Sequence, residues 1–201
     1  MLYLKNQFSV FLLVIGVVIA TSCENESVTS NTEFGIFSNL NESTMEINGV
    51  IDSDTPIHWE NYISSYPNTK MMFMRDCPGS DDDDANLEVA RKMRTYGLEI
   101  HLPSDASIAS GATDMFLAGI KRTRESGSQI GVHSWSDGSN EATSFPIGHE
   151  NHLPYINYYV EMGFSQKEAE DFYYFTINAA SAADIHWMTD EEIERYKLLT
   201  E

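Results

Sequence analysis

The sequence predicts an α/β domain in which a mostly parallel sheet is flanked by helices. Strand-like and helix-like segments alternate along the chain from residue 45 onward. This alternation is typical of parallel strands joined by crossover helices. About 155 residues follow the N-terminal segments, which is enough for one domain with an apolar core. We find no internal repeat and no second domain boundary.

Short apolar or alternating segments are predicted to form the strands. They cover residues 45–51, 70–74, 98–102 and 129–133. Segments with helical periodicity or helix start signals predict helices over residues 54–65, 84–96, 110–118, 154–162 and 166–178. A turn over residues 77–80 follows the second strand.

Several helix ends have recognisable signals. Pro56 is typical of a first helical turn, and Gly97 of the position just after a helix. Ser165 with Glu168, and Thr189 with Glu192, have the spacing of capping boxes, in which two side chains bond the free backbone groups of a helix start.

The first 22 residues are predicted to be a lipoprotein signal peptide. Lys5 gives a positive start, residues 8–19 are strongly apolar, and small residues lead up to Cys23. This ending resembles the lipobox of bacterial lipoproteins, so Cys23 is the expected lipidation site. An ordinary signal peptide and a single N-terminal anchor are the alternatives. The lipoprotein interpretation places the protein in the bacterial cell envelope, held by its lipid on the periplasmic or outer-membrane face.

Residues 23–43 are predicted to be a flexible tether, because they are rich in Asn, Ser, Thr and Glu. The folded domain is then expected over residues 44–201. With Cys23 acylated, only Cys77 remains, and no intramolecular disulfide can form. The formal net charge is −19, and removal of Lys5 with the signal peptide makes it −20. Such acidity argues against nucleic acid and anionic membrane surfaces as partners.

The main functional signal lies in residues 106–135. A turn of small residues presents Ser110 just before an apolar helical segment, and a later apolar strand ends in His133. Serine-hydrolase chemistry needs such a pair, because a free hydroxyl is a poor nucleophile until a base accepts its proton. Taken alone, Ser110 also suits an ordinary helix N-cap, and His133 suits a strand-end histidine with a local partner.

The flanking residues make the resemblance specific. This region resembles the nucleophile-to-histidine segment of the Clp protease proteolytic subunit. The residues that carry the resemblance are ASGA (109–112), FLAG (116–119), Arg124, GS (127–128) and GVH (131–133). Predicted periplasmic members of that superfamily are more similar still. Residues 77–80 (CPGS) lie where the family has Ser-Pro-Gly-Gly, and residues 184–198 resemble its C-terminal segment. The resemblance covers about residues 46–198.

The resemblance implies a ClpP/crotonase-like spiral of βαβ units and a Clp-type serine endopeptidase activity. Ser110 would be the nucleophile, His133 the general base and Asp184 the third triad member. The oxyanion would be held by the N–H of Gly111 and by the backbone of Gly79 or Ser80. Counted back from Tyr196, Asp184 lies one residue away from the position of the acidic residue in the family pattern. Asp190, the other nearby aspartate, is better interpreted as a residue of a first helical turn. The resemblance implies peptides or proteins as substrates and implies no cofactor or metal. It is also compatible with assembly of the protein into a homo-oligomer.

Three departures from the family pattern keep other functions open. Ser80 replaces the second glycine of the oxyanion turn, Cys77 replaces a serine, and Asp114 stands in a normally apolar helix. A non-catalytic binding or assembly protein of the envelope is therefore the alternative. A crotonase-like acyl-CoA enzyme is disfavoured, because a lipoprotein outside the cytoplasm does not meet CoA.

An acidic segment and a group of histidines could suggest metal sites, but their spacing does not fit the known metal-binding motifs. Residues 81–84 are all Asp, but the glycine and glutamate of an EF-hand loop are missing, so acid in a first helical turn fits better. His149 and His152 are three residues apart, not the four of zinc-protease helices, and His186 is distant in sequence. Lys121, Arg122 and Arg124 are interpreted as a solvated strand face.

Overall fold

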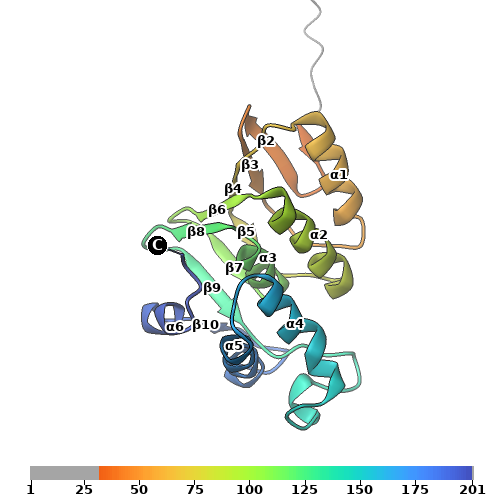
Figure 1. Ribbon diagram of the computed structural model, residues 1–201, viewed down its shortest axis with the longest axis vertical. Helices are drawn as coiled ribbons and strands as arrows, with labels where there is room; N and C mark the ends of the chain where they lie inside the picture. The colour runs from red at the N-terminus through yellow and green to blue at the C-terminus, as the bar shows by residue number, and fades with distance from the viewer. Residues whose placement is uncertain (1–31, 201) are drawn as a thin grey trace, which may run out of the picture. The chain divides into compact units, whose positions relative to one another are not determined.

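The computed structural model describes residues 32–200, which form two sheets with helices packed around them (Figure 1). The first sheet has six strands in the order β1-β2-β3-β4-β6-β8, and the second has four in the order β10-β9-β7-β5. The predicted α/β class, with a largely parallel sheet and flanking helices, is confirmed. Within the described residues, no helix is long and apolar enough to cross a membrane.

The first sheet joins an antiparallel start to a parallel body. Strands β1 to β3 pair antiparallel, whereas β3, β4, β6 and β8 pair parallel. Their bounds are β1 Glu33–Phe34, β2 Phe37–Asn41, β3 Thr44–Ile47, β4 Met71–Met74, β6 Glu99–Leu102 and β8 Lys121–Arg124.

Three strands of the second sheet directly follow strands of the first, and the fourth comes after helix α5 (Gln166–Ala179). The four are β5 Asp76–Cys77, β7 Ser107–Ala109, β9 Gln129–Val132 and β10 His186–Trp187. Strands β5, β7 and β9 pair parallel, and β10 pairs antiparallel with β9. The chain therefore passes three times from the first sheet to the second, as β4 to β5, β6 to β7 and β8 to β9. This repetition brings the carboxyl ends of β5, β7 and β9 to one edge.

The helices match the predicted segments to within one or two residues at their ends. They are α1 Thr55–Ser65, α2 Asp83–Tyr96, α3 Gly111–Leu117, α4 Leu153–Glu161, α5 Gln166–Ala179 and α6 Asp190–Arg195, with short 3-10 turns at Ala142–Ser144 and Glu150–His152. Asp82 caps α2, and Gly97 ends it in the left-handed conformation. Both predicted capping boxes are present, at the starts of α5 and α6.

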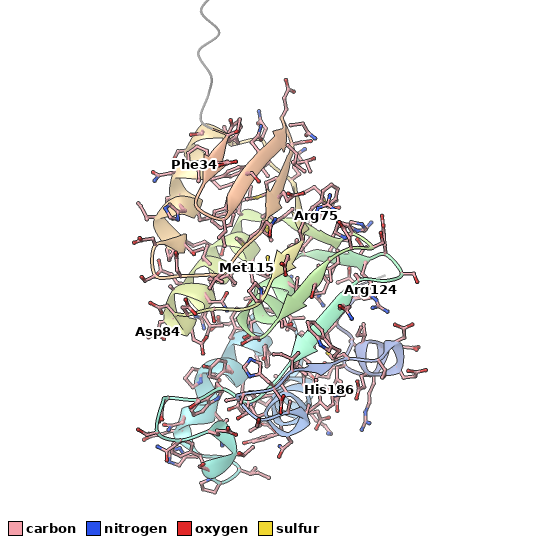
Figure 2. The ribbon with its side chains drawn as sticks, turned by 180° about the vertical axis from the view of Figure 1, so that it is seen from behind. Phe34, Arg75, Asp84, Met115, Arg124 and His186 are labelled. Carbon is pink, nitrogen blue, oxygen red and sulfur yellow. The ribbon has the colours of Figure 1, made fainter. Side chains whose placement is uncertain are left out.

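The core lies between the sheets and the helices. The predicted apolar face of α2 is buried, with Leu87, Ala90 and Met93 at most 5% exposed. In α3, Met115 and Phe116 are fully buried, and Met115 lies in the middle of the domain in Figure 2. Burial of this face holds the short helix α3 in place, because a helix of this length is unstable alone.

The tether predicted over residues 23–43 is too long. Residues 33–41 form β1 and β2, and Phe37 is fully buried against Trp59 and Tyr62, with ring centroids 6.0 and 6.3 Å away. The polar composition of the segment hid the few aromatic residues that pack on α1. The domain therefore includes residues from at least 33 onward. The predicted signal peptide and Cys23 lie outside the described residues.

The interpretation of Arg122 as part of a solvated face is also wrong. Arg122 is only 6% exposed. Its guanidinium donates hydrogen bonds to the carbonyls of Gly119 (3.1 Å) and Leu198 (2.6 Å), and more weakly to those of Leu117 and Lys197. Burial, together with the charge of Arg94, lowers the Arg122 pKa to about 10. Backbone carbonyls thus satisfy a cation whose burial the local sequence does not indicate.

Candidate active site

The predicted site residues follow strands that end at the same edge of the second sheet. In the parallel ladders, Cys77 pairs with Ile108, and Ala109 pairs with Gly131. Gly79, Ser110 and His133 follow these three strands within two residues, so the topology brings them together. The carboxyl ends of parallel strands are the usual place for a site in α/β folds.

Ser110 stands in a strained turn between β7 and α3. Its φ of 55° and ψ of −132° give it a positive φ, which costs a non-glycine residue about 1–3 kcal/mol. Its N–H donates to the Gly131 carbonyl (3.1 Å), and the Thr113 hydroxyl donates to the same oxygen (2.8 Å). The Ser110 side chain makes no capping bond to α3. This sharp strand-to-helix turn resembles the nucleophile elbow of α/β-hydrolases.

Gly79 lies directly against Ser110. It has a φ of 141°, and a Cβ added there would lie 2.9 Å from Ser110 Cβ, so no larger residue fits without a shift. Ser80, in contrast, does not share the positive φ of Gly79. Its hydroxyl donates to Asp83 Oδ1 (2.5 Å). The serine that replaces the family's second glycine therefore occupies a backbone conformation open to any residue.

Gly111 completes the surroundings of Ser110. Its N–H is the first of α3 and has no acceptor within the helix. A Cβ added to Gly111 would lie 2.3 Å from Ser80 Oγ, so the two turns pack tightly. Buried Asn86 donates from Nδ2 to the Gly111 carbonyl (2.9 Å) and ties α2 to this turn. The residues predicted to hold an oxyanion thus lie on both sides of Ser110.

Ser110 and His133 line the same pocket. Its volume is about 40 Å³, and it extends from Ser110 between the helices. His133 is partly buried, and its Nδ1 atom is fully buried without a hydrogen-bond partner in the described structure. A buried polar atom in this state costs about 1–3 kcal/mol. The structure therefore brings the predicted nucleophile and base to one pocket, with the inner nitrogen of the base unpaired.

Asp184 is not among the residues that line this pocket. It is exposed, in the segment just before β10. Since His186 pairs with Val132, extending the antiparallel register by one residue sets Ile185 opposite His133. Asp184 itself lies outside the strand, in a turn where its N–H donates to the Ser181 carbonyl (3.1 Å). Its role in a triad stays a prediction. Asp190 lies in the first turn of α6, as expected.

The acid–tyrosine lining of the pocket was not predicted from the sequence. Asp83 accepts hydrogen bonds from Ser80 and from the Tyr155 hydroxyl (2.6 Å), and Asp114 accepts one from the Tyr159 hydroxyl (2.7 Å). Burial raises the pKa of Asp114 to about 7; the charge of Asp83 adds to the rise, and the Tyr159 bond opposes it. Asp114 itself was visible in the sequence. The tyrosines of α4 carried no signal, because they reach the pocket only through tertiary packing.

Two of the histidines considered as metal ligands have side-chain partners. Buried His152 contacts the Tyr173 hydroxyl through Nδ1 (2.7 Å), and His186 contacts Glu192 through Nε2 (2.9 Å). Between residues 32 and 200, no group of three or more His, Cys, Asp or Glu side chains is placed to hold a metal ion.

Comparison with known proteins supports the fold. No protein-family model matches the sequence, and no curated protein matches it. Among solved structures, the chain is similar to 1510-N, a membrane-bound stomatin-specific protease, in a serine-to-alanine variant. The TM-score is 0.51 at 19% identity, over 79% of this chain and 76% of that one. A lysine-to-alanine variant of the same protease with a substrate peptide gives 0.51 at 20% identity, over 79% and 72%. The fold is ClpP-like, as predicted.

Proposed function

We propose that this protein is a serine hydrolase that cleaves peptide bonds. The observation that carries the proposal is the strained Ser110, whose hydroxyl caps nothing and which shares a pocket with His133. A residue held in a costly backbone conformation and left without a structural bond is typical of a functional position. The ClpP-like fold of the protease neighbours agrees with this function.

The arrangement supports acyl transfer in two steps. Ser110 Oγ would attack the peptide carbonyl carbon while His133 accepts the hydroxyl proton and then gives it to the leaving amine. Water would next attack the acyl-enzyme, with His133 again as base, and restore Ser110. The N–H of Gly111, with that of Gly79 or Ser80, would donate to the oxyanion. Asp184 would orient His133 only if the segment before β10 brings its carboxylate to the unpaired Nδ1.

We also propose that the domain is held in the bacterial envelope by a lipid on Cys23. The support is the lipobox-like sequence before Cys23. Cys23→Ser should abolish lipid attachment, measured by metabolic labelling with a fatty-acid analogue. Undiminished labelling of that variant would rule out the lipoprotein. Peptide or protein substrates outside the cytoplasm follow from both parts of the proposal, and self-association of the domain is compatible with them.

A second candidate function is a non-catalytic binding or assembly module of the envelope. It is favoured by the unpaired His133 Nδ1 and by the exposed position of Asp184. In this case the pocket would hold a peptide without cleaving it.

Labelling with a serine-reactive fluorophosphonate separates the two functions. The wild-type domain should be labelled, and Ser110→Ala and His133→Ala should not. Ser165→Ala, which removes another helix-starting serine, is the matched control and should label like the wild type. A wild type that neither reacts with the probe nor cleaves any peptide of a broad library would leave the binding module as the function.

A further inference from the structure

The pocket beyond Ser110 has two acidic side chains in its lining. They are Asp83 from α2 and Asp114 from α3, and no Lys or Arg among residues 32–200 lines the pocket. Two carboxylates in one partly enclosed pocket repel each other and lose hydration. A cation that enters the pocket therefore interacts favourably with both carboxylates.

The partners of these carboxylates are neutral hydroxyls. Asp83 accepts from Ser80 and Tyr155, which use one hydrogen bond on each of its oxygens. Asp114 accepts on Oδ1 from Tyr159, and Oδ2 has no hydrogen bond within the described structure. Burial raises the Asp114 pKa, as expected for a carboxylate that lacks a compensating cation. The hydroxyls orient the carboxylates but leave their charge uncompensated.

The walls of the pocket are aromatic. Trp135 stacks on Tyr155 with ring centroids 6.1 Å apart, and Tyr155 stacks on Tyr173 at 5.9 Å. Aromatic rings of this kind cover the methylene stem of a charged side chain. The pocket volume is only about 40 Å³, so a Lys or Arg side chain displaces some of these rings when it enters.

We propose that this pocket selects a substrate whose acyl side of the scissile bond ends in Lys or Arg, with Asp114 and Asp83 as the specificity-determining residues. The inference rests on the proposed hydrolysis at Ser110, because only that chemistry gives the pocket its place beside the cleaved bond. The cationic head would reach the two carboxylates, and the stem would lie against Tyr155 and Tyr173. An apolar side chain would leave the carboxylates desolvated, and an acidic one would be repelled.

A matched peptide series tests the selectivity. One fluorogenic peptide is made with Lys, Arg, norleucine, Gln or Glu before the scissile bond. The wild type should cleave the Lys and Arg peptides at least about 30-fold more efficiently in kcat/KM than the norleucine peptide. Asp114→Asn, which keeps the shape of the side chain, should remove most of that ratio. Glu191→Gln on exposed α6 makes the same charge change and should leave it intact. Equal or better cleavage of the norleucine peptide would overturn the proposal while hydrolysis itself stands.

A binding measurement covers the case in which no peptide is cleaved. The Ser110→Ala domain is titrated with n-butylguanidinium, n-butylammonium and neutral n-butanol, followed by NMR shifts of the pocket residues. The two cations should bind more tightly than the alcohol, and a further Asp114→Asn change should weaken them by about tenfold or more. Thermal denaturation confirms that each variant is folded. If the alcohol binds as well as the cations, or if Asp114→Asn changes nothing, the pocket is not a cation site.

Discussion

Two of the described helices begin with a serine, and the two serine side chains form different contacts. At the start of α5, Ser165 is extended, with φ −66° and ψ 158°, and its side chain accepts a hydrogen bond from the Glu168 N–H. At the start of α3, Ser110 has a positive φ, and its side chain makes no capping hydrogen bond to the helix. The same residue type at the same helix position therefore stabilises one helix and is left free on the other. A serine that the fold holds under strain, and does not use as a cap, is available for chemistry.

The largest expected effect concerns activity. Ser110→Ala and His133→Ala should each lower peptide hydrolysis by about 10³-fold or more, and the double variant should be little worse than either, because the two side chains act as one unit. Asp184→Asn tests the third position and should reduce the rate less. Steady-state kinetics on one fluorogenic peptide gives the comparison. Additive losses in the double variant would mean that the two residues do not act together.

The second effect concerns how α3 is held without a cap. Since Phe116 is fully buried, Phe116→Ala should lower the free energy of unfolding by about 3–5 kcal/mol. Denaturant unfolding measures it. An unchanged midpoint would mean that packing does not hold this helix.

The third effect is a pH dependence that comes from Asp114. Folding raises its pKa from 3.8 to about 7, so the folded protein binds this proton more tightly than the unfolded chain. The contribution of Asp114 to stability is therefore present below about pH 4 and is lost as the pH rises to about 7. The free energy of unfolding of Asp114→Asn, relative to wild type, should thus rise between pH 4 and pH 8 by up to roughly 4 kcal/mol.

The difference in unfolding free energy between the wild type and Asp114→Asn isolates Asp114. The other titratable groups of the pocket, Asp83, His133, Tyr155, Tyr159 and Tyr173, are common to both proteins. Denaturant unfolding at a series of pH values measures it. A flat difference would mean that the carboxylate is solvated in the folded protein.

The smallest effect compares the two serines directly. Ser165→Ala removes a capping bond and should lower the free energy of unfolding by about 1 kcal/mol, with no change in hydrolysis. Ser110→Ala removes no capping bond, so its stability should match the wild type while hydrolysis is lost. Thermal denaturation and the kinetic assay on the same samples give both values. A stability loss in Ser110→Ala as large as that in Ser165→Ala would show that Ser110 is a cap after all.

The sequence predicted the features that depend on neighbours in the chain. The caps of α5 and α6 and the glycine after α2 are set within a few residues, so their patterns were sufficient. Ser110 was predicted before a helix and His133 at a strand end, and both lie at such positions. Their meeting at one sheet edge depends on β7, a strand of three residues that was not predicted. Arg122 was misjudged because two of its carbonyl partners, at Lys197 and Leu198, are far along the chain. Asp184 lies in a turn before β10, and no local pattern determines where that turn directs its side chain.

The buried guanidinium of Arg122 has a consequence for biosynthesis. It links the carboxyl end of α3, at Leu117 and Gly119, to the segment at Lys197 and Leu198. A nascent chain or a proteolytic fragment that ends before residue 197 would keep this cation but lack two of its acceptors, and an unpaired buried charge is strongly destabilising. The helix that follows Ser110 therefore gains these contacts at its carboxyl end only after nearly the whole domain has been translated.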